Sequence, residues 1–562
     1  MPVPRWGFGP IRPGPARLST MTAERPRTSG TLPTSSSRGR CRAKAPAPGE
    51  NRPGPSLGID LGTTRTVVAR VDRGNYPVVP FPDEHGDPQE YLPSLTALTP
   101  DGLVHGFAAR AAAREGAPLL RSLKRRLSSP RITPATELEL GGQRFTVLEI
   151  LTDYLRHLRA QLKAAPGMDG TDPGARGSRV SVAVAVPAHA FGAQRLLTLE
   201  AFGDAGFNVI AMLNEPSAAG FEYTHRKART VSSRRSRVLV YDLGGGTFDT
   251  SLVDVRGVAH EVLASRGLGD LGGDDVDLLL AQLALERAGV REEDLNDREV
   301  SDLLDQCRDA KEALAPQTRR IALDVRGKDI IIQTAELYDV CKPLLERSLD
   351  VMEPLIGRLA DGDPDLTEVA GVHLVGGGSA LPLVPRMLRE RFGARVHRSP
   401  YPGASTAIGL AIASDRDSGY DLIDRLSRGF GVFREADDGQ RTTFDAILGE
   451  DAIQAGATRE GTVITRQYTA VHNIGCFRFV ECAGVDADGE PRGELAPYQE
   501  IIFPFDPALR DEDLSGRPVE RTGAGRRVQE RYEIDSAGLV QVTITDLEDG
   551  FSRRYVLGRQ TA

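Results

Sequence analysis

Two short segments place a carboxylate at the end of an apolar strand and follow it with glycine and threonine. They are residues 59–64, Ile-Asp-Leu-Gly-Thr-Thr, and residues 241–249, Tyr-Asp-Leu-Gly-Gly-Gly-Thr-Phe-Asp. Glycine lets backbone N–H groups approach a phosphate closely, and threonine adds a hydroxyl donor. A strand-end carboxylate such as Asp60 or Asp242 suits Mg²⁺, which usually keeps several waters. Two such hairpins facing each other are predicted to clamp a polyphosphate from both sides.

Each glycine-rich turn could also be only a hairpin connector with no binding role. That interpretation is favoured for one segment alone, but two copies with the same aspartate and threonine argue against it. Neither copy matches the strand–GxxxxGK[ST]–helix phosphate-binding loop, which excludes that class. A third glycine cluster, residues 374–379, precedes the helix-like residues 383–392. A glycine turn before a helix suits an anion or a sugar–phosphate, and equally a tight strand–helix connection.

The motifs need strands to carry them and helices to cover those strands. Apolar runs and alternation predict strands, and longer amphipathic runs predict helices. The expected strands are residues 56–60, 66–69, 180–186, 238–241, 251–255 and 369–375. The expected helices lie at about 147–164, 190–205, 274–315 and 335–360, with loops at 166–178 and 225–237.

The pattern changes after about residue 428. Short strands of alternating polarity follow one another between Gly, Asp and Pro turns, as in residues 463–468, 477–480 and 540–544. This pattern is typical of a separate all-β domain. Its last strand is expected to end near Leu557.

Composition limits the possible classes of protein. The 562 residues suffice for two to four domains, and no stretch is long and apolar enough to cross a bilayer. Residues 1–55 hold 18 Gly or Pro and are expected to be disordered, with Met21 as an alternative initiator. They also hold ten Lys or Arg against two Glu, so the rest of the chain carries a net charge of −16, which argues against nucleic-acid binding. Five scattered cysteines indicate no disulfide framework or metal site, and we expect a cytoplasmic protein.

Five motifs resemble, in order along the chain, those of the heat-shock protein 70 (Hsp70) family of chaperones. They are residues 59–64, 214–219, 242–249, 268–277 and 373–382, and residues 532–542 are the best match in the C-terminal part. The resemblance implies an α/β actin-like (ribonuclease H-like) two-lobed ATPase domain followed by a small all-β sandwich. It divides the chain into a disordered basic segment 1–55, an ATPase domain 56–415, a linker 416–428 and a substrate-binding-like β sandwich 429–562.

The resemblance also implies roles for single residues in binding ATP or ADP with Mg²⁺ and in slow hydrolysis of ATP. The metal carboxylates fall on Asp60 and Asp242. The catalytic groups, which touch phosphate or orient the attacking water, fall on Lys124, Glu215, Thr247 and Asp249. The nucleotide contacts fall on Gly62, Thr63, Thr64, Arg65, Gly244, Gly245, Gly246, Gly273, Lys311, Gly376, Gly377 and Gly378. Such a set could supply an in-line water and neutralise phosphate charge.

Some of these residues also have ordinary explanations. Lys124 could lie on a solvated basic helix face, but only seven of the 70 basic residues are lysine, which favours a function. Glu215 suits a helix start because of the helix dipole, and this is compatible with its catalytic role. Pro187 and Arg195 resemble the family's proline switch and arginine relay, although Pro187 could simply end a strand.

The adenine side departs from the family pattern. Glu312 and Ala380 replace two arginines that stack on adenine, and Arg308 replaces a ribose-binding glutamate. Ala315 and Gly403 replace a serine and an aspartate. Loss of both guanidinium groups removes cation–π contact with the purine, which predicts weaker binding or relaxed base choice.

The linker and the C-terminus differ as well. Residues 421–426 interleave charges with aliphatic side chains, and burying those charges would disfavour docking of the linker on the ATPase domain. Coupling between the domains is therefore left open. The chain ends five residues after Leu557, and we expect no helical lid over the β sandwich.

Three functions are compatible with these residues. The first is a chaperone-like ATPase that binds extended polypeptide and could use J-domain or nucleotide-exchange cochaperones, with no nucleic acid or membrane partner. The second is a nucleotide-binding scaffold or sensor whose β domain binds one specific partner. The third, a small-molecule kinase, is disfavoured because such a kinase has no use for the β domain, although fold alone does not assign function.

Overall fold

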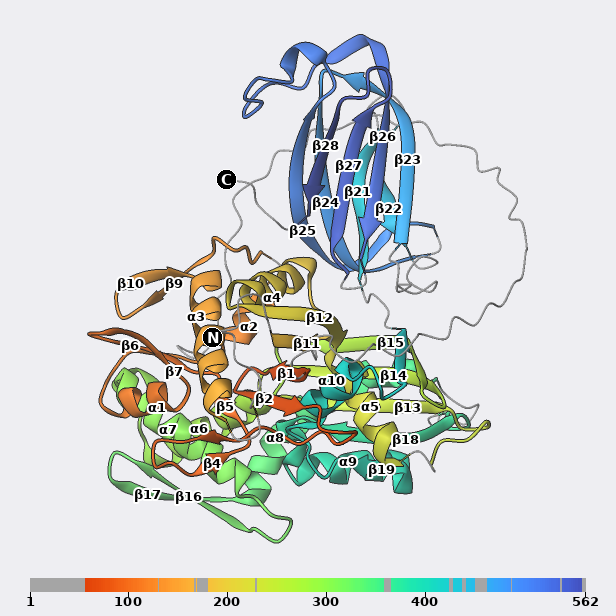
Figure 1. Ribbon diagram of the computed structural model, residues 1–562. Helices are drawn as coiled ribbons and strands as arrows, with labels where there is room; N and C mark the ends of the chain where they lie inside the picture. The colour runs from red at the N-terminus through yellow and green to blue at the C-terminus, as the bar shows by residue number, and fades with distance from the viewer. Residues whose placement is uncertain are drawn as a thin grey trace, which may run out of the picture.

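The computed structural model describes residues 56–129, 131–165, 168, 180–227, 230–357, 365–423, 428–436, 441–449, 462–486, 488–535 and 538–557. These residues form two regions, one above the other in Figure 1. We call residues 56–423 the α/β region and residues 428–557 the β region. The predicted disorder of residues 1–55 lies outside the described residues.

The first half of the α/β region, lobe I, is built on a five-stranded sheet in the order β12-β11-β1-β2-β5. Its strands are β1 (Leu57–Leu61), β2 (Arg65–Arg70), β5 (Leu92–Pro93), β11 (Val180–Val186) and β12 (Phe207–Asn214). Strands β1 and β11 pair in parallel and are almost wholly buried, as their continuous apolar sequences predict. Helices α3 (Val147–Ala164) and α4 (Gly192–Asp204) pack against this sheet in one core. A capping box of Thr146 and Glu149 begins α3.

Small elements complete lobe I around this sheet. Its short strands are β3 (Phe81–Pro82), β4 (Pro88–Gln89), β6 (Thr96–Thr99), β7 (Gly102–His105), β8 (Leu119–Leu120), β9 (Glu137–Leu140) and β10 (Gln143–Thr146). Its short helices are α1 (Gly106–Arg114) and α2 (Leu123–Leu127). Helix α2 carries the buried Lys124.

Lobe II repeats the plan with a six-stranded sheet in the order β19-β18-β13-β14-β15-β20. Its strands are β13 (Arg237–Leu243), β14 (Phe248–Arg256), β15 (Ala259–Leu268), β18 (Val369–Val375), β19 (Val396–Arg398) and β20 (Asp421–Ile423). Strands β13 and β14 form an antiparallel hairpin and β13 pairs in parallel with β18, just as β1 pairs with β2 and with β11. The two aspartate motifs therefore occupy equivalent hairpins of the two lobes.

Helices and one hairpin share a hydrophobic core with the lobe II sheet. They are α6 (Gly273–Ala288), α7 (Asp297–Glu312), α8 (Thr334–Met352), α9 (Leu383–Phe392), β16 (Arg320–Val325) and β17 (Lys328–Gln333). The helical stretch predicted over 274–315 is two helices, because Gly289 ends α6 with a φ of +67°.

Two helices pack against each other between the two large sheets, α5 (Glu215–Lys227) and α10 (Ser405–Ser414) (Figure 1). They touch closely at Gly409, where a Cβ would come within 1.8 Å of the Ala218 carbonyl oxygen. Helix α5 runs further into the predicted 225–237 loop than expected. Its last turn holds His225, Arg226 and Lys227, and basic residues near a helix C-terminus are favoured by the dipole.

The β region is a sandwich of two antiparallel sheets, in the orders β22-β21-β24-β25 and β23-β26-β27-β28. Its strands are β21 (Gly429–Ala436), β22 (Arg441–Leu448), β23 (Thr462–His472), β24 (Ile474–Val485), β25 (Pro491–Pro504), β26 (Arg521–Ile534), β27 (Val540–Asp546) and β28 (Ser552–Val556). Buried side chains from both sheets form one core. Within it Arg434 makes a bidentate pair with Glu530 and lies over the Tyr468 ring, which satisfies a buried charge.

The segment before the β region differs from expectation. Asp421–Ile423 forms β20, which pairs in parallel with the edge strand β15, with Leu422 opposite His260. Charges in this segment were predicted to disfavour such docking. Main-chain pairing with a sheet edge does not depend on side-chain polarity, which accounts for the difference.

Candidate functional site

The two aspartate hairpins meet face to face between the lobes. A Cβ on Gly245 would lie 2.6 Å from the Thr64 methyl carbon, and one on Gly246 would lie 2.7 Å from the Thr63 methyl carbon. Both contacts leave no room for a side chain on the second hairpin. The sequence-based expectation that the two hairpins face each other is met by this arrangement.

The same backbone hydrogen bond closes both turns. The Gly62 N–H donates to the Arg65 carbonyl over 3.0 Å, and the Gly244 N–H donates to the Thr247 carbonyl over 2.9 Å. Thr247 is buried. The two lobes thus present matching tight turns to one cleft.

The third glycine cluster packs behind the second hairpin. Gly376 has a φ of +80°, and a Cβ there would lie 2.4 Å from a carboxylate oxygen of Asp242. A Cβ on Gly378 would lie 2.9 Å from the Gly244 carbonyl oxygen. No such close neighbour faces Gly377, where a Cβ would meet open space among the described residues. Glycine is therefore required sterically at two of the three predicted positions.

The start of α6 joins the same cluster. The Gly273 N–H donates to the Gly244 carbonyl over 3.0 Å, and the Lys311 ammonium donates to the Gly273 carbonyl over 2.8 Å. Lys311 also pairs with Asp277 at 2.7 Å. Burial raises the pKa of Asp277 to about 6, although Lys311 opposes the shift. The structure thus brings the predicted Gly273 and Lys311 to the second hairpin.

A buried acidic cluster with one ammonium group lies at the centre of the cleft. The Lys124 ammonium donates to the Glu215 carboxylate. Burial raises the pKa of Asp242 well above its ordinary value, and Glu215, Asp60 and Asp249 raise it further. Burial likewise raises the pKa of Asp60, while Lys124 lowers it.

Burial and the neighbouring charges also shift the pKa values of Lys124 and Glu215. Burial raises the pKa of Glu215 to about 7, against the opposing charge of Lys124. Burial alone would lower the pKa of Lys124, but the charges of Glu215, Asp60 and Asp249 more than offset it and the pKa is raised. The cluster therefore has more carboxylates than one ammonium can neutralise, an environment that a cation would stabilise.

Asp60 and Asp242 fit a hydrated Mg²⁺ better than a metal held by protein alone. Among the described residues, no three His, Cys, Asp or Glu side chains converge to form a metal site. Mg²⁺ commonly takes one or two carboxylates together with substrate phosphates and waters. Asp60 and Asp242 supply only two carboxylates, and the cluster around them has excess negative charge. Both features agree with binding of a largely hydrated Mg²⁺.

Asp249 is fixed through one of its two oxygens. Its Oδ1 accepts the Ala188 N–H at 2.8 Å and lies 3.0 Å from Nδ1 of His189. Its Oδ2 has no hydrogen-bond partner among the described residues. Sequence reasoning missed His189, whose only signal was its place two residues after Pro187.

Nearby, Arg195 donates to the Asn214 side chain over 2.7 Å, beside Glu215. Asn214 ends β12 and Glu215 begins α5. The predicted relay arginine therefore contacts the strand end that precedes a predicted catalytic residue.

An ion pair between Arg65 and Glu312 lies at the mouth of the cleft. The Arg65 guanidinium lies 4.4 Å from the centroid of the Tyr91 ring and pairs with Glu312 of α7. Arg308, on the same helix, is drawn to Asp274 and Asp277 at 3.7 and 3.9 Å. Arg65 was predicted to contact nucleotide, and here it joins the lobes across the cleft.

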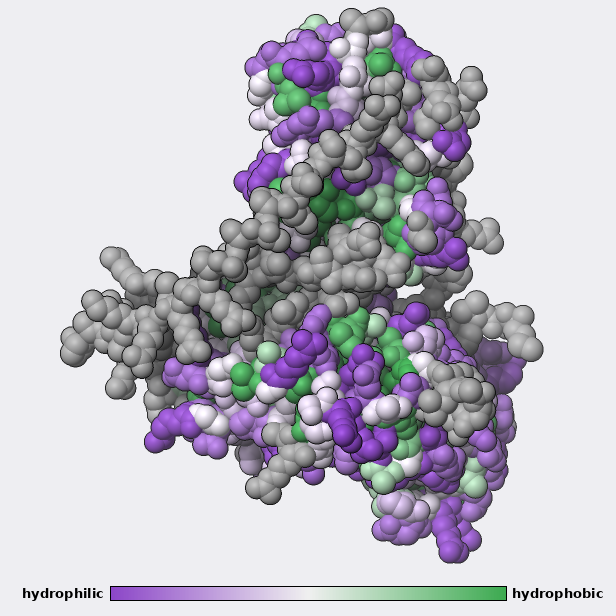
Figure 2. Space-filling view, turned by 90° about the vertical axis from the view of Figure 1, so that its right-hand side faces the viewer, coloured by the Kyte–Doolittle hydropathy of each residue, from purple (hydrophilic) through white to green (hydrophobic). Residues whose placement is uncertain are grey.

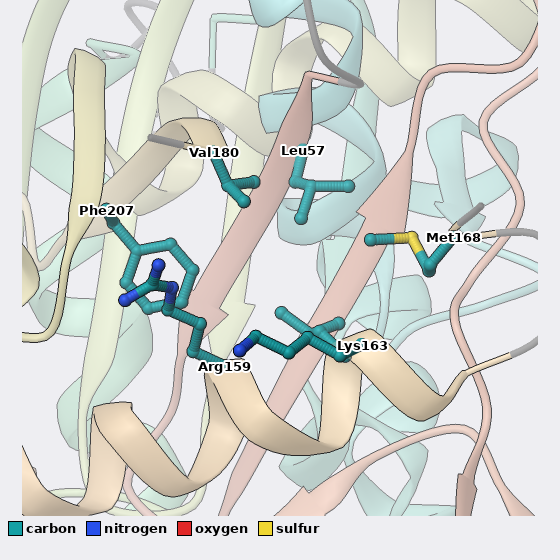
Figure 3. Close-up of a pocket in the computed structure, with 7 residues that line it drawn as sticks. Leu57, Arg159, Lys163, Met168, Val180 and Phe207 are labelled. Atoms are coloured by element: carbon teal, nitrogen blue, oxygen red, sulfur yellow. The ribbon is translucent and has the colours of Figure 1, made fainter. Parts of the chain in front are cut away.

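Two pockets lie in lobe I. One is lined by Gly62, Ser94, Lys124 and Tyr154 together with apolar residues, and it adjoins the first hairpin. The other, in Figure 3, is formed around the N-terminal end of β1 by side chains including Arg159 and Lys163 of α3. It lies at the opposite end of β1 from Asp60 and does not belong to the site.

The β region touches the α/β region close to this site. The Gly192 N–H, at the start of α4, donates to the Glu481 carboxylate of β24 over 3.0 Å. A Cβ on Gly192 would lie 2.2 Å from the Tyr498 hydroxyl, and Arg428 lies over the Phe191 ring at 3.8 Å. Only three residues separate Gly192 from Ala188, whose N–H donates to Asp249.

Comparison with known proteins agrees with these features. A family model described as Hsp70 protein matches residues 127–424, more than half of the chain. The chain belongs to the Hsp70 family. The predicted family and fold class are thereby confirmed: an Hsp70 actin-like nucleotide-binding domain with mixed sheets, followed by a β-rich C-terminal region. Members of this family are ATPases that bind ATP or ADP with Mg²⁺.

Individual relatives are chaperones. The chain is 33% identical over 381 residues to the chaperone protein HscA homolog of Laribacter hongkongensis, covering 64% of this chain and 58% of that protein. It is 34% identical over 401 residues to the chaperone protein HscA of Salmonella arizonae, covering 67% and 61%. The match to the HscA homolog of Ralstonia pickettii is 32% over 538 residues, covering 90% and 78%. The chain thus spans about three-fifths of the first two relatives.

The surface of this Hsp70 family member is largely hydrophilic on the side seen in Figure 2, with smaller apolar patches on both regions. Every helix among the described residues is too short or too polar to span a bilayer. The domain boundaries and the roles of single site residues remain predictions.

Proposed function

We propose that this chain is a chaperone-type ATPase that binds ATP with Mg²⁺ and slowly hydrolyses it to ADP and phosphate. The observation that supports this best is the meeting of two matching hairpins over one buried cluster of Lys124, Glu215 and Asp249. Membership of a family of ATPases supports it independently.

Different residues of the site bind the phosphates and the metal. The turns at Thr63–Thr64 and Gly244–Thr247 bind the phosphates, with N–H and hydroxyl donors. Asp60 and Asp242 hold a hydrated Mg²⁺, which neutralises phosphate charge when bound. Lys124 adds positive charge at the phosphates.

Two carboxylates, those of Asp249 and Glu215, position the attacking water. Asp249 accepts a hydrogen bond from the attacking water at Oδ2, which has no partner among the described residues, and Glu215, tied to Lys124, orients that water from the other side. Thr247 donates its hydroxyl to the terminal phosphate. Catalysis here is positioning plus charge neutralisation, as phosphoryl transfer requires.

Single-turnover hydrolysis of Mg²⁺–ATP tests the proposal. Lys124→Ala and Thr247→Ala are each expected to slow the step by about tenfold or more with the fold intact, because each removes a contact to the transferred phosphate. Lys163→Ala, an exposed lysine on α3, is the control and should match the wild type. Equal rates in wild type and both site variants would show that the activity has another source.

We further propose that the β region binds extended polypeptide. The support is the family membership, the description of the relatives as chaperones, and a sandwich with edge strands such as β23. An extended segment can add to such an edge through main-chain hydrogen bonds. Fluorescence anisotropy of a labelled apolar peptide, with and without ATP, tests this, and absence of binding would favour a module for one folded partner.

A further inference from the structure

Asp249 is held asymmetrically. Two donors converge on its Oδ1, the Ala188 N–H at 2.8 Å and the His189 ring nitrogen Nδ1 at 3.0 Å, whereas Oδ2 has no partner among the described residues. Both donors belong to one short segment between β11 and α4. A carboxylate gripped in this way cannot rotate freely, so the free oxygen keeps a constant direction.

The His189 ring sits in a slot between glycines. A Cβ on Gly267 would lie 2.4 Å from Nδ1, and one on Gly269 would lie 3.3 Å from Nε2. The slot therefore fits the imidazole only because both neighbours lack side chains. Nε2 is buried without a hydrogen-bond partner among the described residues.

The charges that face this ring come from three elements. They are Asp249 of β14, Glu215 at the start of α5, and Arg428 just before β21. Burial and Arg428 lower the pKa of His189, but the two carboxylates more than offset them and the pKa is raised. The ring therefore keeps its proton to a higher pH than an ordinary imidazole does.

We propose that His189 is a positioning residue for the hydrolysis of ATP, holding Oδ1 of Asp249 through its Nδ1–H so that Oδ2 faces the attacking water. This inference rests on the proposed ATPase function. The Nδ1–H is present in the imidazolium and in one neutral tautomer, so the hydrogen bond is kept on both sides of the titration. The positive charge of the ring is not kept, and its loss leaves the Asp249 carboxylate a stronger acceptor for the hydrogen bond of the attacking water.

Two substitutions separate hydrogen bonding from filling of the slot. His189→Leu fills the slot without a donor, and His189→Asn places an amide donor where Nδ1 lies but cannot titrate. We expect His189→Leu to lower the single-turnover rate by about tenfold with ATP affinity unchanged, since misplacing a catalytic group affects the chemical step. His189→Asn should recover most of that loss.

The pH profile provides a readout that a merely structural role would not change. In the wild type the single-turnover rate should rise above pH 6.5 as the imidazolium loses its proton and Asp249 becomes a better acceptor. The His189→Asn profile should keep only the part of that rise that comes from Glu215, whose pKa is about 7, and should therefore be shallower than in the wild type. An unchanged rate in His189→Leu, no recovery in His189→Asn, or the same rise in His189→Asn would each overturn the inference.

A second measurement checks the pairing without hydrolysis. The pKa of His189, followed by NMR titration of the full chain, should fall when Asp249→Asn removes the carboxylate charge. An unchanged pKa would contradict the pairing. A wild type that hydrolyses no ATP would contradict the proposed function, whereas normal hydrolysis with an indifferent His189 contradicts this inference alone.

Discussion

Glu312 stands at the mouth of the cleft, where the Hsp70 resemblance places an arginine stacked on adenine. Its carboxylate pairs with Arg65, whose guanidinium covers the Tyr91 ring. With Ala380 on the other side, neither predicted stacking position carries a guanidinium of its own. We therefore expect weak ATP binding and little preference for ATP over GTP.

Restoring the two arginines tests this expectation. Glu312→Arg combined with Ala380→Arg should tighten ATP binding by about tenfold, since each solvent-exposed cation–π contact contributes about 0.5–1 kcal/mol. Calorimetric titration with ATP and GTP measures the effect. Glu346→Arg, exposed on α8, makes the same charge change as Glu312→Arg away from the cleft and should have no effect. Tight, strongly ATP-selective binding by the unmodified chain would refute the expectation.

At this scale, the sequence predicted residue types but not all their partners. The structure brings together Asp60, Asp242 and Asp249, which the motif spacing singled out, because strand-end aspartates in two like hairpins have little freedom of placement. The motif spacing could not show that Arg65 pairs with Glu312, 247 residues away. It also missed His189, because a ring nitrogen beside a carboxylate 60 residues later leaves no local pattern.

At the scale of elements, the two hairpins act as one unit because their turns interlock. The Gly245 position lies against Thr64 so closely that any side chain there must displace it. Threonine is stiff at χ1, so it cannot yield by a small rotation. The contact between the turns therefore fixes the spacing of the groups that we propose bind phosphate.

Gly245→Ala is expected to weaken ATP binding by about tenfold or more while shifting the unfolding midpoint little, since it moves one hydroxyl donor away from the phosphates. ATP titration and thermal unfolding measure the two effects. Gly203→Ala in α4 is the matched control, because a Cβ there meets open space and helix interiors favour alanine. Unchanged ATP affinity in Gly245→Ala would show that Thr64 does not contact nucleotide.

Elements with a strong local signal were predicted well. Strand β11 and helices α3 and α9 match the predicted ranges, because a valine-rich run, a capping box and helical periodicity are all local. The pairing of β20 with β15 was not predicted, since it depends on a free sheet edge more than 150 residues earlier. The order of strands in both large sheets was likewise not predicted, since it depends on pairing between segments far apart in the sequence.

At the scale of the whole molecule, the β region and the proposed catalytic cluster are joined through one short segment. Ala188 and His189 hold Asp249, and Gly192 at the other end of the segment donates to Glu481 of the β region. The segment has little freedom, because Phe191 lies under Arg428. Docking of the β region is therefore expected to depend on the charge of Glu481.

The sign of that dependence follows from the pKa of Glu481, which burial raises to about 7 although Arg428 and the Gly192 N–H oppose the shift. A carboxyl whose pKa is raised on docking favours the docked state fully below its ordinary pKa of 4.5, and that contribution is lost as pH rises through about 7. A shift of this size corresponds to about 3 kcal/mol. The docked arrangement should therefore weaken between about pH 5 and pH 8.

Hydrogen exchange of the Gly192 amide, compared at pH 6 and pH 8 after correction for intrinsic rates, measures this docking. The wild type should lose protection by about tenfold or more at pH 8, because ionised Glu481 is costly to bury. Glu481→Gln keeps an acceptor for the Gly192 N–H but cannot ionise, so its protection should vary little with pH. Glu500→Gln, a half-exposed carboxylate on the neighbouring strand β25, is the control and should behave as the wild type. If Glu481→Gln retained the wild-type pH dependence, the two regions would be joined by groups other than this carboxylate.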